Sequence, residues 1–169
     1  MKQLGKDALG GLPAGVGLPL YLDDDLDIGI VHFGVGNFHR SHQAMYLDRL
    51  MNAGLAREWA ISGVGLLERD AAMRDALGGQ DGLYTLALRR PDGTNDFAVI
   101  GSIREYLFAP EQPEQLLERL TAPGTRIVSL TVTEGGYVYD PTTGRLPEHD
   151  PLVVEETAGG LAAPRTAFG

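Results

Sequence analysis

The stretch IGIVHFGVGNFHRSH, residues 28–42, decides how this chain is expected to fold. An apolar run ending at Phe33 meets two glycines, Gly34 and Gly36, and a segment that can form a helix follows from about His39. The first glycine lets a strand turn sharply, and the second lets the backbone approach a pyrophosphate closely. The start of the helix then offers free N–H groups and a positive dipole end. The pattern predicts a dinucleotide-binding unit. Because His39 replaces the third glycine of the usual fingerprint, a strand–helix turn without a ligand stays an alternative.

Composition narrows the class of protein. With 169 residues, 43% of them hydrophobic and 22% charged, the chain is predicted to form one soluble domain. Its net charge of −9 argues against nucleic acid, which binds a basic face, and against anionic membrane surfaces. Cysteine is absent, which excludes disulfides and thiolate metal sites. Neither an apolar run of membrane length nor a signal-peptide core is visible, so we expect a cytoplasmic protein.

Strand-like and helix-like segments alternate after residue 28. Ala44, Leu47 and Leu50 recur at helical spacing, and Gly54 follows where a C-cap glycine is typical. A strand–helix–strand–helix order indicates a right-handed, doubly wound unit. The predicted elements are a strand at 28–33, a helix at 40–52, a strand at 59–64 and a helix at 69–77.

The middle of the chain departs from this alternation. Residues 83–89 and 97–103 flank Pro91-Asp92-Gly93-Thr94, which predicts an antiparallel hairpin. A helix is expected at 113–120 and a strand at 126–132, and the chain beyond Tyr137 reads as irregular. The predicted fold is therefore α/β and Rossmann-like, with a doubly wound, mostly parallel sheet and an inserted antiparallel hairpin. The predicted organisation is an N-terminal leader at 1–27, outside the core, a cofactor-binding domain at 28–150 and a tail or linker at 151–169.

Several segments, in the same order, resemble the mannitol 2-dehydrogenase family, the polyol-specific long-chain dehydrogenases. They are GVGNFHRSH (34–42), QAMY (43–46), GVGL (63–66), GQDGLYTL (79–86), IGSI (100–103) and RIVSLTVTEGGY (126–137). The resemblance runs from about Leu18 to Phe168. It implies an NAD-binding Rossmann-type domain whose cofactor contacts are Gly34, Gly36, Asn37, Phe38, Asp70, Thr131 and Thr133.

An acidic side chain after the second strand can accept hydrogen bonds from the adenosine ribose. Glu68 and Asp70 both qualify, and the resemblance selects Asp70. Asp70 is equally placed to be the N-cap of the helix that follows, which stays open. A carboxylate repels a 2′-phosphate whereas Arg69 attracts one, so NAD is the expected cofactor, with NADP less preferred.

Glu134 and the histidine pair are further candidates, for a substrate site and a metal site. The resemblance puts Glu134 at the mouth of the polyol site, although a Gly-Gly turn with Glu134 exposed is the alternative. His39 and His42 have helical i, i+3 spacing, yet no carboxylate or third histidine lies at ligand spacing nearby. We expect no metal site, and the resembling dehydrogenases work without zinc.

The resemblance also assigns catalysis to a Lys-x-x-x-x-Asn-x-x-His motif in a second, C-terminal helical domain. The lysines here are Lys2 and Lys6, and neither begins that motif. The chain is therefore expected to be an inactive N-terminal fragment, missing the C-terminal domain of its parent. That parent would interconvert a sugar alcohol and a ketose, of the mannitol and fructose type, by hydride transfer.

Other functions remain open at this point. A fructuronate or tagaturonate reductase, or an arabinitol dehydrogenase, would share the same N-terminal pattern. A stand-alone, non-catalytic nucleotide-binding module is a second class. An S-adenosylmethionine-dependent methyltransferase is a third, since a glycine turn and an acid after the second strand suit that cofactor too.

Overall fold

The computed structural model describes residues 3–22, 25–131, 140, 142–145 and 147–159. Its chain divides into two compact units, residues 1–131 and 132–169, each of which is described by itself below. The predicted domain limits at 28–150 and 151–169 stay predictions. Among the described residues, no helix is both long enough and apolar enough to cross a membrane.

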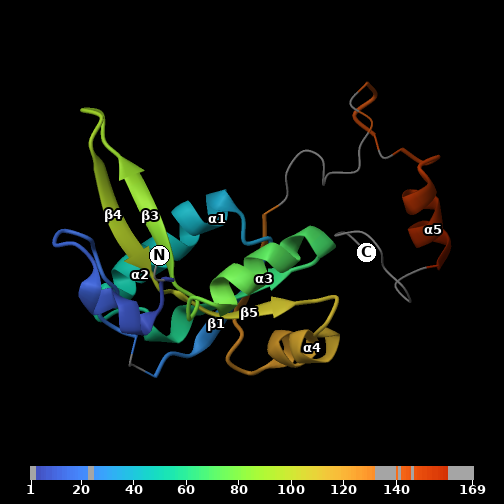
Figure 1. Ribbon diagram of the computed structural model, residues 1–169. Coiled ribbons are helices and arrows are strands. Elements are labelled where there is room, and N and C mark those ends of the chain that lie inside the picture. The colour runs from blue at the N-terminus through green and yellow to red at the C-terminus, as the bar shows by residue number, and fades with distance from the viewer. Residues whose placement is uncertain (1–2, 23–24, 132–139, 141, 146, 160–169) are drawn as a thin grey trace. The chain divides into compact units, whose positions relative to one another are not determined.

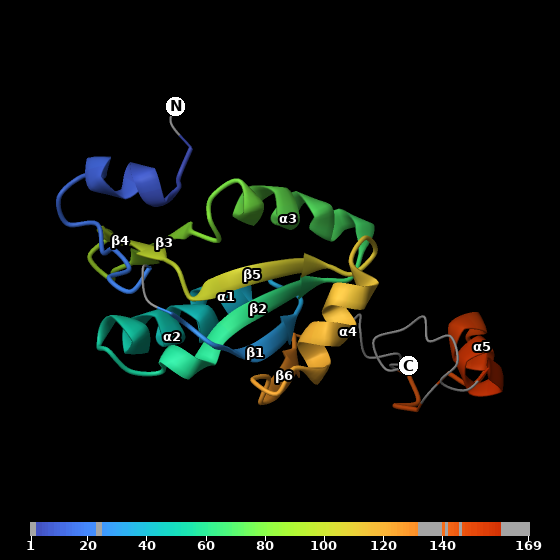
Figure 2. The same ribbon diagram turned by 90° about the horizontal axis from the view of Figure 1, so that it is seen from below.

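The first unit is built on a four-stranded sheet in the order β5-β2-β1-β6. All of its pairings are parallel, with Val31 of β1 opposite Ser62 of β2 on one side and Val128 of β6 on the other. The strands lie side by side in Figure 2. Their bounds are β1 (Ile28–Phe33), β2 (Ala60–Gly65), β5 (Ile103–Phe108) and β6 (Ile127–Leu130).

The helix expected at 40–52 begins earlier and is interrupted. It comprises α1 (Asn37–Ser41) and α2 (Gln43–Asn52), which meet at His42, where φ is −123° and ψ is −85°. Gly54, with φ of 75°, ends α2 as predicted, because this left-handed conformation suits a residue without a Cβ. The other described helices of the first unit are α3 (Ala71–Gly78), α4 (Pro113–Thr121) and three 3-10 turns, η1 (Lys6–Gly11), η2 (Arg57–Trp59) and η3 (Glu68–Asp70).

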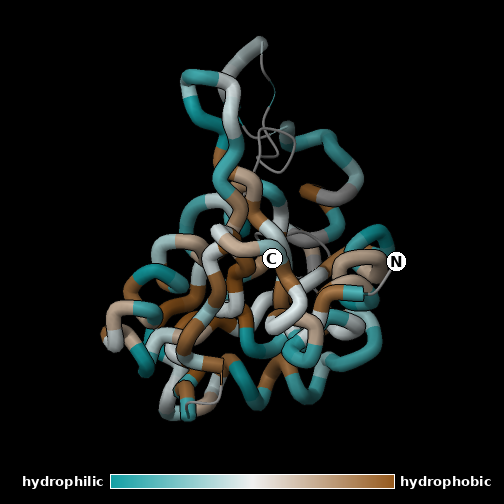
Figure 3. The backbone as a smooth tube through the Cα atoms, turned by 60° about the vertical axis from the view of Figure 1, so that its left-hand side comes forward, coloured by the Kyte–Doolittle hydropathy of each residue, from teal (hydrophilic) through white to brown (hydrophobic). Residues whose placement is uncertain are grey.

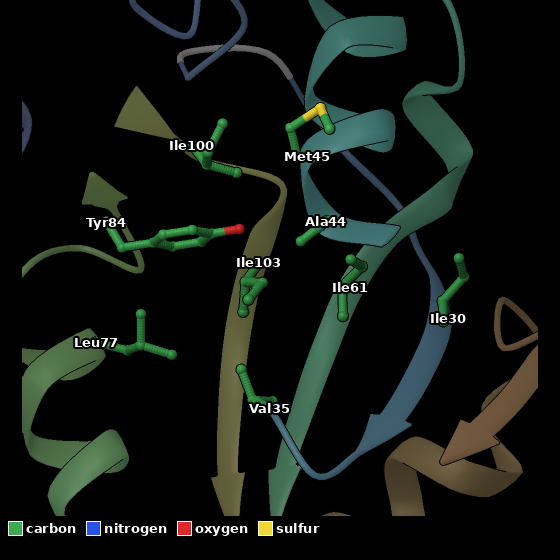
Figure 4. Packing of buried hydrophobic residues seen from close by; sticks show 9 residues of the cluster. All are labelled: Ile30, Val35, Ala44, Met45, Ile61, Leu77, Tyr84, Ile100 and Ile103. Atoms are coloured by element: carbon green, nitrogen blue, oxygen red, sulfur yellow. The ribbon is translucent and has the colours of Figure 1, made fainter. Parts of the chain in front are cut away.

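Helices cover both faces of the sheet. Neighbouring residues on a strand point to opposite faces. On β2, Ile61 lies in the main hydrophobic cluster, whereas Ser62 donates a 2.6 Å hydrogen bond to Glu105 of β5. Glu105 also accepts two 2.8 Å hydrogen bonds from Arg119 of α4. Thus α2 and α3 pack on one face and α4 on the other, which confirms the doubly wound α/β fold. The cluster in Figure 4 comprises Ile30, Val35, Ala44, Met45, Ile61, Leu77, Tyr84, Ile100 and Ile103.

The inserted hairpin consists of β3 (Tyr84–Arg89) and β4 (Asn95–Ile100), and it projects from the rest of this unit (Figure 1). Its tip is hydrophilic in Figure 3. The Asp92 carboxylate accepts from the Thr94 backbone at 2.9 Å and from its hydroxyl at 2.6 Å, which shapes the predicted turn. The strand expected at 97–103 is two strands: β4 ends at Ile100, and the chain bends there to enter the parallel sheet as β5. Because residues 97–103 form one continuous run typical of a strand, the sequence did not indicate that the chain changes sheet there.

The N-terminal segment is part of the core, so its interpretation as a leader outside the core at 1–27 was wrong. Tyr21 is 2% exposed, and its hydroxyl donates to the buried carboxylate of Asp48 on α2. Asp48 also accepts the backbone N–H of Gly101 at 2.9 Å. Gly17 pairs with β4 through two backbone hydrogen bonds of 2.9 and 2.8 Å. The apolar residues of this segment lack a regular period, because they pack against partners far along the chain.

The second unit contains α5 (Pro151–Gly159), where the sequence indicated irregular structure or linker. Before it, Asp140 closes a turn by accepting the Thr142 backbone N–H at 2.8 Å. The missed helix begins at Pro151, a residue favoured in a first helical turn. Its apolar residues do not recur at helical spacing, so the hydrophobic pattern of the sequence did not predict this helix.

Candidate functional site

The sheet reverses its winding beside β1. The chain proceeds from β1 to β2 and β5 on one side and then returns to place β6 on the other side of β1. In open α/β sheets, ligands bind in the crevice at the carboxyl ends of the two strands where the winding reverses. The candidate site is therefore the region where β1 runs into residues 34–38 and β6 runs into Thr131.

The glycine turn lies directly at this point. Gly34 still donates its N–H to the Val64 carbonyl of β2 at 2.9 Å. Its φ of 86° then turns the chain out of the sheet. Gly36 is the N-cap of α1, and Gly36, Asn37 and Phe38 are exposed. The N–H groups of a first helical turn have no partner within the helix. Because Asn37 and Phe38 begin α1 and are exposed, solvent reaches the start of this helix, as an anion-binding turn requires.

Arg40 holds this turn in shape. Its guanidinium donates to the carbonyl oxygen of Val35 at 2.8 Å and to the side-chain oxygen of Asn37 at 2.6 Å. The hydroxyl of Tyr84 donates to the backbone carbonyl of Arg40 at 2.6 Å, and Figure 4 shows this hydroxyl pointing away from the hairpin towards the helical layer. Sequence reasoning assigned no role to Arg40. The available signal was its i, i+3 spacing from Asn37 on one helix face.

Asp70 lies at the carboxyl end of β2. One of its carboxylate oxygens accepts the backbone N–H groups of Leu66 and Leu67, both at 3.0 Å. Asp70 is also the N-cap residue of α3, so that alternative is correct in position, but among the described residues its side chain makes no capping hydrogen bond to this helix. The carboxylate instead accepts from Leu67 at the start of η3. Glu68 and Arg69 beside it are exposed. The structure therefore places an acidic group where a ribose-binding acid is expected, already oriented by two backbone amides.

Two buried histidines join the glycine turn to β6. His32 on β1 lies with Nδ1 at 2.9 Å from the Ser129 hydroxyl and Nε2 at 3.0 Å from the Thr131 hydroxyl. The ring of His39 from α1 stacks on it, with centroids 3.8 Å apart. Burial lowers the pKa of His32, and burial together with the proximity of His32 lowers the pKa of His39 to about 3. Both rings are therefore neutral near pH 7.

The structure thus brings together five of the seven expected cofactor contacts on neighbouring segments: Gly34, Gly36, Asn37, Phe38 and Thr131. A Cβ built on Gly34 would lie 3.6 Å from the Thr131 carbonyl oxygen, so the turn and the end of β6 are adjacent. Asp70 lies one strand away, at the end of β2. Thr133 and Glu134 fall outside the described residues, and their roles stay predictions.

His39 and His42 do not share an environment. His39 is 1% exposed, whereas His42 is exposed and stacks on Phe38 with centroids 4.5 Å apart. Within the described part of the chain, no three His, Asp or Glu side chains gather into a metal-binding group. The pairing of His32 with Ser129 and Thr131 was missed, because 97 and 99 residues separate these partners.

Fold and site together define a Rossmann-type domain of the kind that binds dinucleotides. Residues 28–167 match the family described as "Mannitol dehydrogenase Rossmann domain". The chain belongs to the mannitol dehydrogenase family, as its sequence motifs indicated, and corresponds to the Rossmann domain of that family.

Relatives with curated names agree with this placement. The mannitol 2-dehydrogenase of Pyricularia oryzae is 45% identical over 153 residues, which are 90% of this chain and 30% of the relative. That of Aspergillus fumigatus is 50% identical over 143 residues, 83% of this chain and 28% of the relative. The chain thus spans about 30% of the length of these relatives.

Solved structures show the same architecture. The Pseudomonas fluorescens mannitol 2-dehydrogenase, in a ternary complex with NAD and D-mannitol, matches with a TM-score of 0.85 and 43% identity, covering 99% of this chain and 34% of that one. A substrate-free D-sorbitol dehydrogenase matches with a TM-score of 0.82 and 40% identity, covering 98% and 34%.

Proposed function

We propose that this chain is the NAD-binding part of an oxidoreductase that interconverts a sugar alcohol and a ketose, of the mannitol and fructose type, by hydride transfer. The observation that carries the proposal is the glycine turn at the winding reversal between β1 and β6, with the Asp70 carboxylate at the end of β2. The related Pseudomonas fluorescens structure, which contains NAD and D-mannitol, supports it.

The backbone at Gly36 is open to an approaching group, which supports a pyrophosphate at this turn. A Cβ built on Gly36 would meet only the Gly34 carbonyl oxygen, at 4.0 Å, so the space beside this glycine is open. The backbone N–H groups of Asn37 and Phe38 would bind phosphate oxygens, with Arg40 holding the turn from behind. The bound nicotinamide would accept or donate the hydride.

The cofactor preference follows from the end of β2. Asp70 has one oxygen engaged with two backbone amides and would accept hydrogen bonds from a ribose hydroxyl with its other oxygen. The same negative charge would repel the 2′-phosphate of NADP, while the exposed Arg69 would partly offset that repulsion. We therefore propose that NAD is preferred and NADP is bound more weakly.

Alcohol oxidation also needs a base for the hydroxyl proton. The motif that the resemblance assigns to this role is absent from the sequence, and we propose that the isolated chain binds cofactor without turning over substrate. Glu134 and Thr133 remain proposed contacts on the substrate side. Because mannitol and sorbitol enzymes match this domain nearly equally well, the proposal extends to the class of sugar alcohol rather than to one compound.

The decisive experiment is a titration of the 169-residue chain with NADH, comparing Gly36→Val with the wild type. Gly36 has φ of −82° and ψ of −174°, an extended conformation that valine adopts readily. The variant should therefore fold, yet its side chain would occupy the space proposed for the pyrophosphate. We expect at least about tenfold weaker NADH binding, the loss of about 1.4 kcal/mol. Gly10→Val, where an added Cβ meets nothing within 4 Å, is the matched control.

Trp59 gives a convenient readout through energy transfer. It lies in η2 at the amino end of β2, so about 20 Å of strand separate it from the carboxyl end. Contact quenching is not expected at that distance, but transfer of tryptophan emission to bound NADH is. Isothermal calorimetry provides an independent affinity. A folded wild-type chain that binds neither NADH nor NADPH would overturn the proposed function.

A further inference from the structure

His32 uses both nitrogens of its ring on the end of one neighbouring strand. Its Nδ1 lies 2.9 Å from the hydroxyl of Ser129 in β6, and its Nε2 lies 3.0 Å from the hydroxyl of Thr131 just after β6. The ring is 4% exposed, and His39 of α1 stacks on it. Neither nitrogen of His39 has a hydrogen-bond partner among the described residues. His39 therefore contacts His32 through its ring face.

A neutral imidazole donates from one nitrogen and accepts at the other. The hydroxyl that receives the N–H of His32 keeps its own hydrogen for another acceptor, whereas the other hydroxyl uses its hydrogen on the ring. Thr131 lies beside Gly34 at the glycine turn, and its backbone N–H donates to Phe33 at 3.1 Å. Its hydroxyl is thus the one of the two placed next to the proposed cofactor crevice.

We propose that His32 is a positioning residue whose Nε2–H donates to the Thr131 hydroxyl and so leaves the hydrogen of that hydroxyl free for a phosphate or carboxamide oxygen of the cofactor. Ser129 then donates to Nδ1. This assignment follows because those cofactor oxygens are acceptors and require a donor. The stacked His39 ring connects His32 to α1, so His32 contacts both α1 and the end of β6 on the two sides of the crevice. The inference rests on the proposed function.

Two substitutions of His32 separate positioning from packing. The amide of glutamine can reach the place of Nε2, and the shorter amide of asparagine the place of Nδ1. Both variants lose the stacked ring, but only His32→Gln keeps a donor for Thr131. We expect His32→Gln to bind NADH within about twofold of the wild type and His32→Asn to bind about tenfold more weakly, the value of one hydrogen bond.

Thr131 supplies the second arm of the test. Thr131→Val should weaken NADH binding about tenfold, and Thr131→Ser, which keeps the hydroxyl, should bind as the wild type does. Adding Thr131→Val to His32→Asn should cause little further loss, because both changes remove the same interaction. Since Thr131 is partly exposed, these two variants should fold even where a His32 variant does not.

Nitrogen-15 NMR of the imidazole reports the tautomer directly and should show a proton on Nε2 of His32. A proton on Nδ1 would overturn the inference. So would equal NADH affinity for His32→Gln and His32→Asn, or an unchanged affinity for Thr131→Val, in a background where the wild type binds. Failure of the folded wild type to bind NADH would instead overturn the proposed function, and the inference with it.

Discussion

Replacing Asp70 with asparagine tests how the domain would select its cofactor. The change removes the negative charge but keeps the size of the side chain and an oxygen to accept the N–H groups of Leu66 and Leu67, each 3.0 Å away. The loop between β2 and α3 should therefore keep its conformation. Asp70→Ala would remove both the charge and these two hydrogen bonds, and it should also lower the stability of the chain.

The magnitude follows from the charge on the acceptor. A hydrogen bond to a charged group is worth about 1.5–3 kcal/mol and a neutral one about 0.5–1.5 kcal/mol. Asp70→Asn should thus weaken NADH binding by about 1–1.5 kcal/mol, close to tenfold. For NADPH the change relieves charge repulsion at a partly exposed site, which solvent screens to about 1 kcal/mol, so binding should tighten about fivefold. The ratio of the two affinities should shift about fiftyfold.

Calorimetric titration of the wild type, Asp70→Asn and Glu68→Gln with both cofactors measures this ratio. Glu68 is the exposed neighbouring acid and serves as the matched control. Because the effect on NADPH is electrostatic, it should shrink as ionic strength rises from about 0.05 M to about 0.5 M. Melting temperatures establish that each variant is folded.

An unchanged NADH-to-NADPH ratio in folded Asp70→Asn would refute the reasoning and leave Asp70 as a cap of its own loop. A shifted ratio in Glu68→Gln alone would transfer the role to Glu68. Weaker binding of both cofactors by the same factor would indicate a change in loop shape rather than in charge.

Two further predictions concern the support of the site. In Gly63→Ala, the new Cβ would lie 2.6 Å from the Val35 side chain. We expect the free energy of unfolding, measured in urea, to fall by about 1–3 kcal/mol and NADH binding to weaken. Gly10→Ala, where the added Cβ meets nothing within 4 Å, should change neither. The pKa of His39 is lowered from 6.5 to about 3, so the unfolded chain binds a proton at this residue more readily than the folded chain. The folded state is therefore fully stable with respect to this group above pH 6.5. As the pH falls from 6.5 towards 3, the free energy of unfolding should decrease by about 1.4 kcal/mol per pH unit. His32 adds to this slope in the same direction, because burial lowers its pKa too. His39→Phe should therefore reduce the slope measured by urea unfolding between about pH 6 and pH 5 without abolishing it. An unchanged slope in His39→Phe would contradict the burial of a neutral ring.

Local signals were sufficient for most elements. The apolar run before Gly34, the glycine after α2 and the Pro-Asp-Gly turn each determine backbone shape within a few residues, and all were recognised from the sequence. The errors arose where local pattern and tertiary context diverge. One run of β-type sequence supplies β4 and β5 to different sheets, and the N-terminal segment packs into the core without any regular spacing.

The sequence by itself determined the class of fold and the position of the glycine turn, because these depend on which backbone conformations each residue can adopt. Only the tertiary structure decided what supports the turn and what joins the N-terminal segment to the core. His32 meets Ser129 and Thr131 across nearly a hundred residues, and Asp48 joins Tyr21 to Gly101. Such contacts depend on strand order and register, which bring together groups that no local spacing relates.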